Sequence, residues 1–124
     1  MIGKTPLIKL EKISEPHCAD IYVKYEKGNP TGSMKDRMAL SMIEGAERRG
    51  ALAAGGRVVE CTGGSTGSSL AMVCAMKGYR AHFVSSDAFT PEKIQTMHAF
   101  GSHVEIIPSK NGLITAKLID QLVA

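Results

Sequence analysis

"RVVECTGGSTGSSLAMVCAMKGYRAHFV", residues 57–84, decides the fold of this chain. A short apolar run leads into a glycine-rich turn, a longer apolar segment follows over residues 66–77, and a second short run begins at Arg80. Short apolar runs bounded by turns predict strands, and the longer segment predicts a helix. The stretch therefore predicts a strand–helix–strand unit.

The pattern continues toward the C-terminus. A third strand is expected from His103 ("HVEII"), with helices over residues 91–100 and 112–123, and Thr90-Pro91 reads as the N-cap and first residue of the former. Three strand-then-helix units in succession predict an α/β fold: an open twisted parallel sheet with right-handed crossovers and flanking helices, in three layers.

The first half of the chain is organised differently. Strand-like runs cover Pro6 to Leu10 and Asp20 to Glu26, and a turn-rich segment precedes a helix expected from Met34 to Arg49. Ser33 and Asp36 form a capping-box pattern, and Gly50 is placed to end the helix. We expect residues 1–50 to form one unit, with N-terminal strands and this helix, and residues 51–124 to form a small βα domain.

Composition excludes several classes of function. The chain has 124 residues, 44% hydrophobic and 22% charged, as is ordinary for one globular domain. The net charge is +3, and the basic residues are interleaved with acidic ones, so they form no basic stripe. Aromatic residues make up 5% and tryptophan is absent. These features argue against nucleic-acid binding. No N-terminal signal pattern or membrane-length apolar run is present. A cytoplasmic protein is expected.

Three cysteines, Cys18, Cys61 and Cys74, lack CxxC spacing. They favour buried free thiols in a reducing compartment over disulfides or a metal site, and no metal is expected. The segment from Ser68 to Met76 is apolar nearly all round. A helix of that kind is buried on more than one side, so we expect a second domain or subunit to cover part of it.

"NPTGSMKDR", Asn29 to Arg37, carries the first candidate functional residue, Lys35. On a helical wheel of ~100° per residue, Met38, Met42, Ala39 and Ala46 fall within ~60° of Lys35, which places the lysine over the centre of an apolar stripe. Desolvation and the positive end of the helix dipole both favour a neutral, nucleophilic amine there. A Schiff-base lysine needs such an amine; a lysine that extends into water or binds a phosphate remains an alternative.

The second candidate is the turn Thr62-Gly63-Gly64-Ser65-Thr66 between a strand and a helix start. Glycines let a ligand come close to the backbone amides, and the start of a helix supplies unpaired N–H groups. Together they form a site for a carboxylate or a phosphate. The alternative is a βα turn without a ligand. A Walker loop is excluded because no lysine follows the glycines, and the acidic residue of a dinucleotide fingerprint is missing.

The same turn also matches GxSxG, the nucleophile elbow of serine hydrolases, at Ser65. Asp87 with His98 or His103 has the chain order that its triad requires. His98 falls within an expected helix, however, and His103 opens a strand at the wrong end of the sheet.

Together these segments resemble one family. "IGKTPLIKL" (2–10), "NPTGSMKDR" (29–37), "VECTGGSTGSSLAMVCAMKGY" (59–79) and "MHAFGSHVEIIP" (97–108) resemble the fold-type II pyridoxal-phosphate enzymes of the cysteine synthase and cystathionine β-synthase group. The resemblance spans essentially the whole chain. It implies a part of a larger two-domain architecture and a transferase or lyase of amino-acid biosynthesis.

The resemblance also implies roles for individual residues. Lys35 is the catalytic Schiff-base lysine and the proton shuttle at the substrate's Cα. Thr62, Gly63, Gly64, Ser65 and Thr66 hold the substrate carboxylate, and Ser65 also contacts the cofactor. The reaction implied is β-replacement on an activated serine-type amino acid, with pyridoxal 5′-phosphate as cofactor.

Two departures from the family pattern matter. The loop usually reads Thr-Ser-Gly-Asn-Thr-Gly, whereas this chain has Gly63 for the serine and Ser65 for the asparagine. The family's glycine-rich phosphate cup is C-terminal to anything in this sequence, so the chain is expected to be an amino-terminal portion that is inactive alone. A homodimer, or completion by a second chain or domain, is the expected partnership; a non-catalytic carboxylate- or partner-binding remnant is the alternative.

Overall fold

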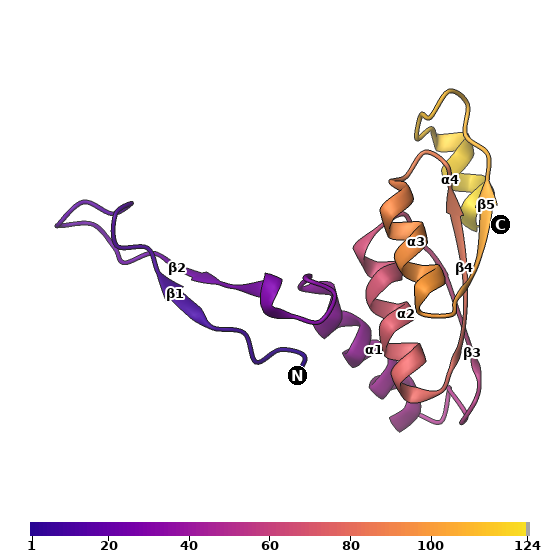
Figure 1. Ribbon diagram of the computed structural model, residues 1–124, viewed down its shortest axis with the longest axis horizontal. Helices are drawn as coiled ribbons and strands as arrows, with labels where there is room; N and C mark the ends of the chain where they lie inside the picture. The colour runs from indigo at the N-terminus through magenta and orange to yellow at the C-terminus, as the bar shows by residue number, and fades with distance from the viewer. Residues whose placement is uncertain (124) are drawn as a thin grey trace.

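A computed structural model describes residues 1–123 of the chain. Its elements in order are β1 (Leu7–Lys9), β2 (Tyr22–Lys24), a short 3-10 helix (Glu26–Gly28), α1 (Lys35–Arg48), β3 (Arg57–Cys61), α2 (Ser65–Lys77), β4 (Arg80–Ser86), α3 (Pro91–Ala99), β5 (His103–Ile107) and α4 (Ala116–Val123). The first two strands form a separate arm that extends from the rest of the molecule (Figure 1).

The predicted parallel sheet is confirmed. Its strand order is β3-β4-β5, with Arg57 opposite Arg80 and His82 opposite His103. Each neighbouring pair is joined through a helix, so the carboxyl ends of all three strands lie at one edge. The turn after β3 lies at this edge, where ligands of open α/β sheets are bound.

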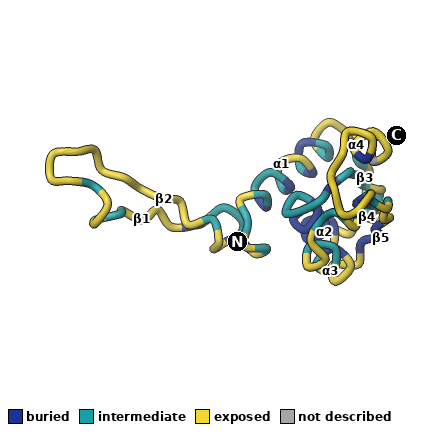
Figure 2. The backbone as a smooth tube through the Cα atoms, turned by 90° about the horizontal axis from the view of Figure 1, so that it is seen from above, coloured by how far each residue is buried: buried dark blue, intermediate teal, exposed yellow. Residues whose placement is uncertain are grey.

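The core lies between the sheet and α2. Leu70, Val73, Phe83 and Met97 are fully buried in one cluster that α1 completes with Ala39 and Ile43. Figure 2 shows the buried residues gathered around these helices and strands, while the arm is exposed. Helix α4 packs against β4 and β5, and its buried Leu118 lies outside this cluster.

The expectation that α2 needs a cover from outside the chain is wrong. Residues 67–74 of α2 are all buried by the chain itself, because α1, α3 and the sheet surround the helix. Met76, at 67% exposed, is the large apolar side chain that the last turn leaves open. The apolar residues on all sides of α2 are therefore covered by α1, α3 and the sheet of this chain.

Most predicted helix boundaries hold within one residue. Helix α1 ends in a Schellman motif, in which Gly50 has a φ of 70° and donates its N–H to Glu47, and Ala51 donates to Ala46. Helix α4 begins four residues later than expected, at Ala116, because Asn111 and Gly112 both have positive φ in a tight turn. Within residues 1–123, no helix combines the length and apolar character needed to cross a membrane.

Candidate functional site

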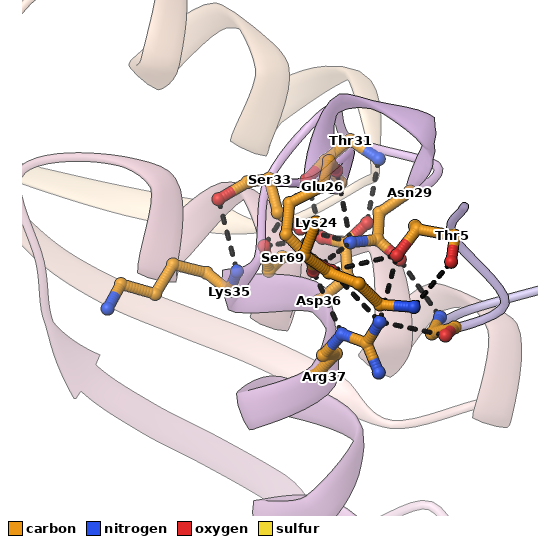
Figure 3. Close-up of polar contacts among 11 residues, drawn as sticks. Thr5, Lys24, Glu26, Asn29, Thr31, Ser33, Lys35, Asp36, Arg37 and Ser69 are labelled. Carbon is orange, nitrogen blue, oxygen red and sulfur yellow. Dashed lines mark hydrogen bonds and ion pairs between the residues drawn. The ribbon is translucent and has the colours of Figure 1, made fainter. Parts of the chain in front are cut away.

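The segment before α1 is held by two side-chain clusters, drawn in Figure 3. In the first, the Asp36 carboxylate is fully buried and accepts hydrogen bonds from the Thr31 N–H at 2.8 Å, the Thr31 hydroxyl at 2.5 Å and the Ser69 hydroxyl at 2.6 Å. The capping box predicted between Ser33 and Asp36 is therefore wrong. Asp36 closes the turn back to Thr31, and the Ser33 hydroxyl instead accepts from the Lys35 N–H at 3.1 Å.

The second cluster fixes the N-terminal segment to α1. Arg37 donates to both Glu26 carboxylate oxygens, from Nε at 2.8 Å and Nη2 at 2.9 Å, and Nη2 also reaches the Gly3 carbonyl at 2.8 Å. Asn29 donates to Glu26 and to the Ser33 carbonyl. Arg37 holds the pKa of Glu26 down, at about 2. The cluster thus anchors both sides of the turn that leads into α1.

Lys35 is the first residue of α1 and is half-buried. Its side chain points away from the two clusters in Figure 3, and its Nζ forms no hydrogen bond or ion pair within residues 1–123. The helical wheel predicted that Lys35 lies over the centre of the buried face, and this prediction is wrong. The buried face is centred on Asp36, Ala39 and Ile43, whereas Met42 is 46% exposed. Lys35 lies at the margin of that face.

The glycine-rich turn leads directly into α2. The Thr62 hydroxyl, which is buried, accepts the Gly67 N–H at 2.9 Å and keeps its own proton to donate. Gly67 has to be glycine, because a Cβ there would lie 2.5 Å from both the Met97 sulfur and the Thr62 methyl group. The turn therefore holds the first N–H groups of α2 at the carboxyl edge of the sheet, in a geometry suited to an anion.

An aromatic ring covers one side of this turn. A Cβ on Gly63 would lie 2.3–2.5 Å from three ring atoms of Phe89, so the ring occupies the space that a side chain at position 63 would take. Phe89 follows β4, in a turn closed by its N–H donating to the Ser86 carbonyl at 3.1 Å. The glycine that departs from the family loop is thus matched by a ring in contact with it.

Helices α1 and α2 run parallel, which brings the two candidate groups together. Near their N-termini, Asp36 is joined to Ser69. Near their C-termini, Glu47 accepts from Lys77 at 2.9 Å, and this bond lowers the pKa of Glu47. The start of α1, with Lys35, therefore lies beside the start of α2, one helical turn from Ser69.

The hydrolase triad does not assemble. Asp87 accepts from the Ser109 N–H at 2.7 Å and from the Ser86 hydroxyl at 3.2 Å. His103 lies at the opposite end of the sheet from Ser65 and contacts His82, with ring centroids 4.6 Å apart. The burial of Cys61 raises its pKa, as in a packed thiol, whereas Cys18 is exposed and not buried as expected.

Sequence reasoning missed Asp36, Ser69 and Phe89. The capping-box pattern assigns Asp36 to a cap, whereas the structure shows a fully buried carboxylate next to the candidate lysine, the most specific polar feature of the site. Its partner Ser69 is 33 residues away along the chain, and Phe89 contacts a turn more than 20 residues before it. The one available signal was the pair of serines, Ser68 and Ser69, within an otherwise apolar helix.

The fold and the paired helix starts define an α/β protein with a glycine-rich turn and a lysine at the carboxyl edge of a parallel sheet, the edge where such folds bind ligands. The chain belongs to the family of pyridoxal-phosphate dependent enzymes, whose family model matches residues 1–121.

Similar proteins agree with this assignment. A cysteine synthase of Staphylococcus aureus is 43% identical over 91% of this chain, and cysteine synthase B of Salmonella typhimurium is 41% identical over 94%. The solved structure of an O-ureido-L-serine synthase matches with a TM-score of 0.80 at 41% identity, over 98% of this chain and 39% of that chain. This chain spans little more than a third of these relatives, 36% and 38% of the two synthases.

The family uses pyridoxal phosphate, and the residues present fit one end of this cofactor. Lys35 offers an amine with no polar partner within residues 1–123, and it lies near the start of a second helix, α2, whose N-cap Gly64 has no side-chain cap bond. Gly55 and Gly56 do not extend the site toward the phosphate, because they precede β3 and so lie at the opposite edge of the sheet.

Proposed function

We propose that this chain provides the lysine-bearing and carboxylate-binding portion of an enzyme that replaces the β-substituent of an activated serine-type amino acid. Its relatives are named for two products, cysteine and O-ureido-L-serine. These amino acids share a backbone and a substituted Cβ and differ in the group attached there. β-Replacement is the reaction class that the two names have in common.

The observation that carries the proposal is the 2.6 Å hydrogen bond between Ser69 and Asp36. It joins the N-terminal ends of two parallel helices. This supports a site in which Lys35, whose amine has no polar partner within residues 1–123, acts together with the turn before α2. The resident cofactor, when bound, supplies an electron sink for the substrate's Cα. Lys35 holds the cofactor and carries the proton to and from Cα.

The turn binds the substrate in this proposal. The backbone N–H groups of residues 63–66 and the hydroxyls of Thr62 and Thr66 hold the carboxylate, favoured by the positive end of α2. Ser65, the first residue of α2, donates its hydroxyl to the cofactor in place of the family's asparagine. Gly63 and Gly64 keep the backbone accessible.

Reductive trapping tests the role of Lys35. The chain is incubated with substoichiometric pyridoxal 5′-phosphate, the link between cofactor and amine is reduced with borohydride, and the modified peptides are quantified by mass spectrometry. Lys93 is the matched control, because it is also half-buried in the first turn of a helix. We expect the adduct on Lys35 in preference to Lys93, and loss of the cofactor's visible absorbance band in Lys35→Ala. Equal modification of the two lysines contradicts the proposal.

We also propose a partner surface on the arm, as part of a division into residues 1–50 and 51–124. Large apolar side chains are exposed on the arm: Leu7, Ile8, Ile13, Ile21, Tyr22, Val23 and Tyr25. Apolar exposure of this extent is typical of an interface. It supports a homodimer or a second chain or domain over the arm, and the three free cysteines support a cytoplasmic location. Light scattering checks the dimer, and a monomeric mass at high concentration excludes it.

A further inference from the structure

Asp36 is the most deeply buried ionisable group beside the site, at 0% exposure. A carboxylate without water has to be compensated, and isolated burial is strongly unfavourable. No ion pair within residues 1–123 involves Asp36; its compensation comes from the three hydrogen bonds of Thr31 and Ser69 and from the positive end of α1. Both oxygens of the carboxylate are thereby occupied, Oδ2 by the Thr31 N–H and Oδ1 by the hydroxyls of Thr31 and Ser69.

The cluster connects three segments at one point. Two bonds from Thr31 fix the turn before α1, and one bond from Ser69 fixes α2. The Thr31 and Ser69 hydroxyls are also 3.3 Å apart, which closes a triangle. Ser69 lies one turn after Ser65 on the same side of α2, because residues four apart share a helix face. The hydrogen bonds of Asp36 therefore fix the distance between the start of α1 and the turn formed by residues 62–66.

Lys35 precedes Asp36 directly and has no polar contact of its own for its Nζ within residues 1–123. Its direction depends on the helical turn from which it projects, and that turn is held by its neighbour. We propose that Asp36 is a positioning residue, which acts through Thr31 and Ser69 to aim Lys35 at the ligand of the turn formed by residues 62–66. The inference rests on the proposed function of Lys35 and assigns a role to a carboxylate that does not touch the reacting atoms.

The test compares how selectively Lys35 is modified. Reductive trapping with pyridoxal 5′-phosphate, as above, gives the ratio of adduct on Lys35 to adduct on Lys93, and urea unfolding of each variant shows that it is folded. Asp36→Ala removes all three acceptor contacts, and we expect the ratio to fall about tenfold or more, the equivalent of one charged hydrogen bond. Asp36→Asn retains the shape and neutral hydrogen bonds, so a smaller decrease is expected.

A matched pair at position 31 isolates the hydrogen bond from packing. Thr31→Val keeps the shape and removes the hydroxyl, whereas Thr31→Ser keeps the hydroxyl. We expect the ratio to fall in the valine variant and to stay near the wild-type value in the serine variant. Asp87→Asn is the control, because that exposed carboxylate is bonded to Ser109 on another segment.

The outcomes separate the two proposals. A wild-type chain that modifies Lys35 no faster than Lys93 overturns the role of Lys35, and with it the inference. A wild-type preference for Lys35 that persists in folded Asp36→Ala and Thr31→Val overturns only the positioning role. If Asp36→Ala does not fold, Asp36→Asn and the Thr31 pair decide in the same way, because a purely structural role changes the unfolding midpoint and leaves the ratio unchanged.

Discussion

We predict that substitutions at Gly63 and Phe89 have coupled effects on the free energy of unfolding. A Cβ at position 63 would lie 2.3 Å from the Cδ1 and Cε1 atoms of Phe89 and 2.5 Å from its Cγ. Because Cγ is among the nearest atoms, rotation of the ring about its own axis cannot relieve the contact. Gly63→Ala therefore requires the whole side chain of Phe89 to move to another rotamer, away from the turn.

The magnitude follows from what Phe89 gives up. A fully buried phenylalanine contributes about 1.5–3 kcal/mol and Phe89 is half-buried, so its displacement costs about 1–2 kcal/mol of unfolding free energy. In a Phe89→Ala background the same substitution meets no ring. It then costs nothing, or stabilises by up to about 1 kcal/mol, because alanine restricts the unfolded chain more than glycine does.

Urea unfolding of the wild type, both single variants and the double variant measures this coupling. We expect Gly63→Ala to lower the unfolding midpoint at constant m-value in the wild-type background and to leave it unchanged or raised with Phe89→Ala. Gly64→Ala is the control within the same turn, because a Cβ there meets nothing within 4 Å. Equal effects of Gly63→Ala in the two backgrounds would refute the reasoning.

Three further predictions concern stability and reactivity. Arg37 depresses the pKa of Glu26 from its ordinary value of 4.5 to about 2, so the ion pair contributes its full stability above pH 4.5 and loses it as the pH falls toward 2. Acid unfolding of Glu26→Gln should lack this phase, whereas Glu92→Gln should retain it. Gly67→Ala should lower the unfolding free energy by about 1–2 kcal/mol in urea, because the contacts with Met97 and Thr62 outweigh the helix propensity of alanine; wild-type stability would contradict this. Burial raises the pKa of Cys74 to about 11, so a thiol reagent should modify exposed Cys18 at once and Cys74 only after unfolding.

The βα half of the fold was predictable because its signals are local. The run RVVEC forms β3 with the expected bounds, and α2 begins one residue before the expected start. Each element there combines an apolar run with a turn residue that ends it, as Gly78 ends α2 with a φ of 76°. The start of α4 was missed because the apolar pattern extends into a turn in which Gly112 has positive φ.

The details of the site were less predictable, for a physical reason. The helical wheel places Met42 on the buried face, and the capping-box spacing assigns Asp36 to a cap, because both weigh each residue by its own polarity alone. In the structure Met42 is 46% exposed and Asp36 is fully buried, since Ser69 supplies a hydrogen bond from a second helix. Polar groups enter a core in pairs, and the partner of a pair cannot be identified from one position of one sequence.

Within the segment from Asn29 to Arg37, the side chains differ in how many hydrogen bonds they form. This difference supports the proposed role of the Lys35 amine. Asn29, Asp36 and Arg37 are held by side-chain bonds of 2.5–3.1 Å, and Ser33 accepts a backbone N–H. Lys35 alone among the charged residues of this segment has no polar partner within residues 1–123. The bonded neighbours fix the helix start from which Lys35 projects and, within residues 1–123, do not engage its amine. The proposed role of Lys35 requires this kind of preorganisation.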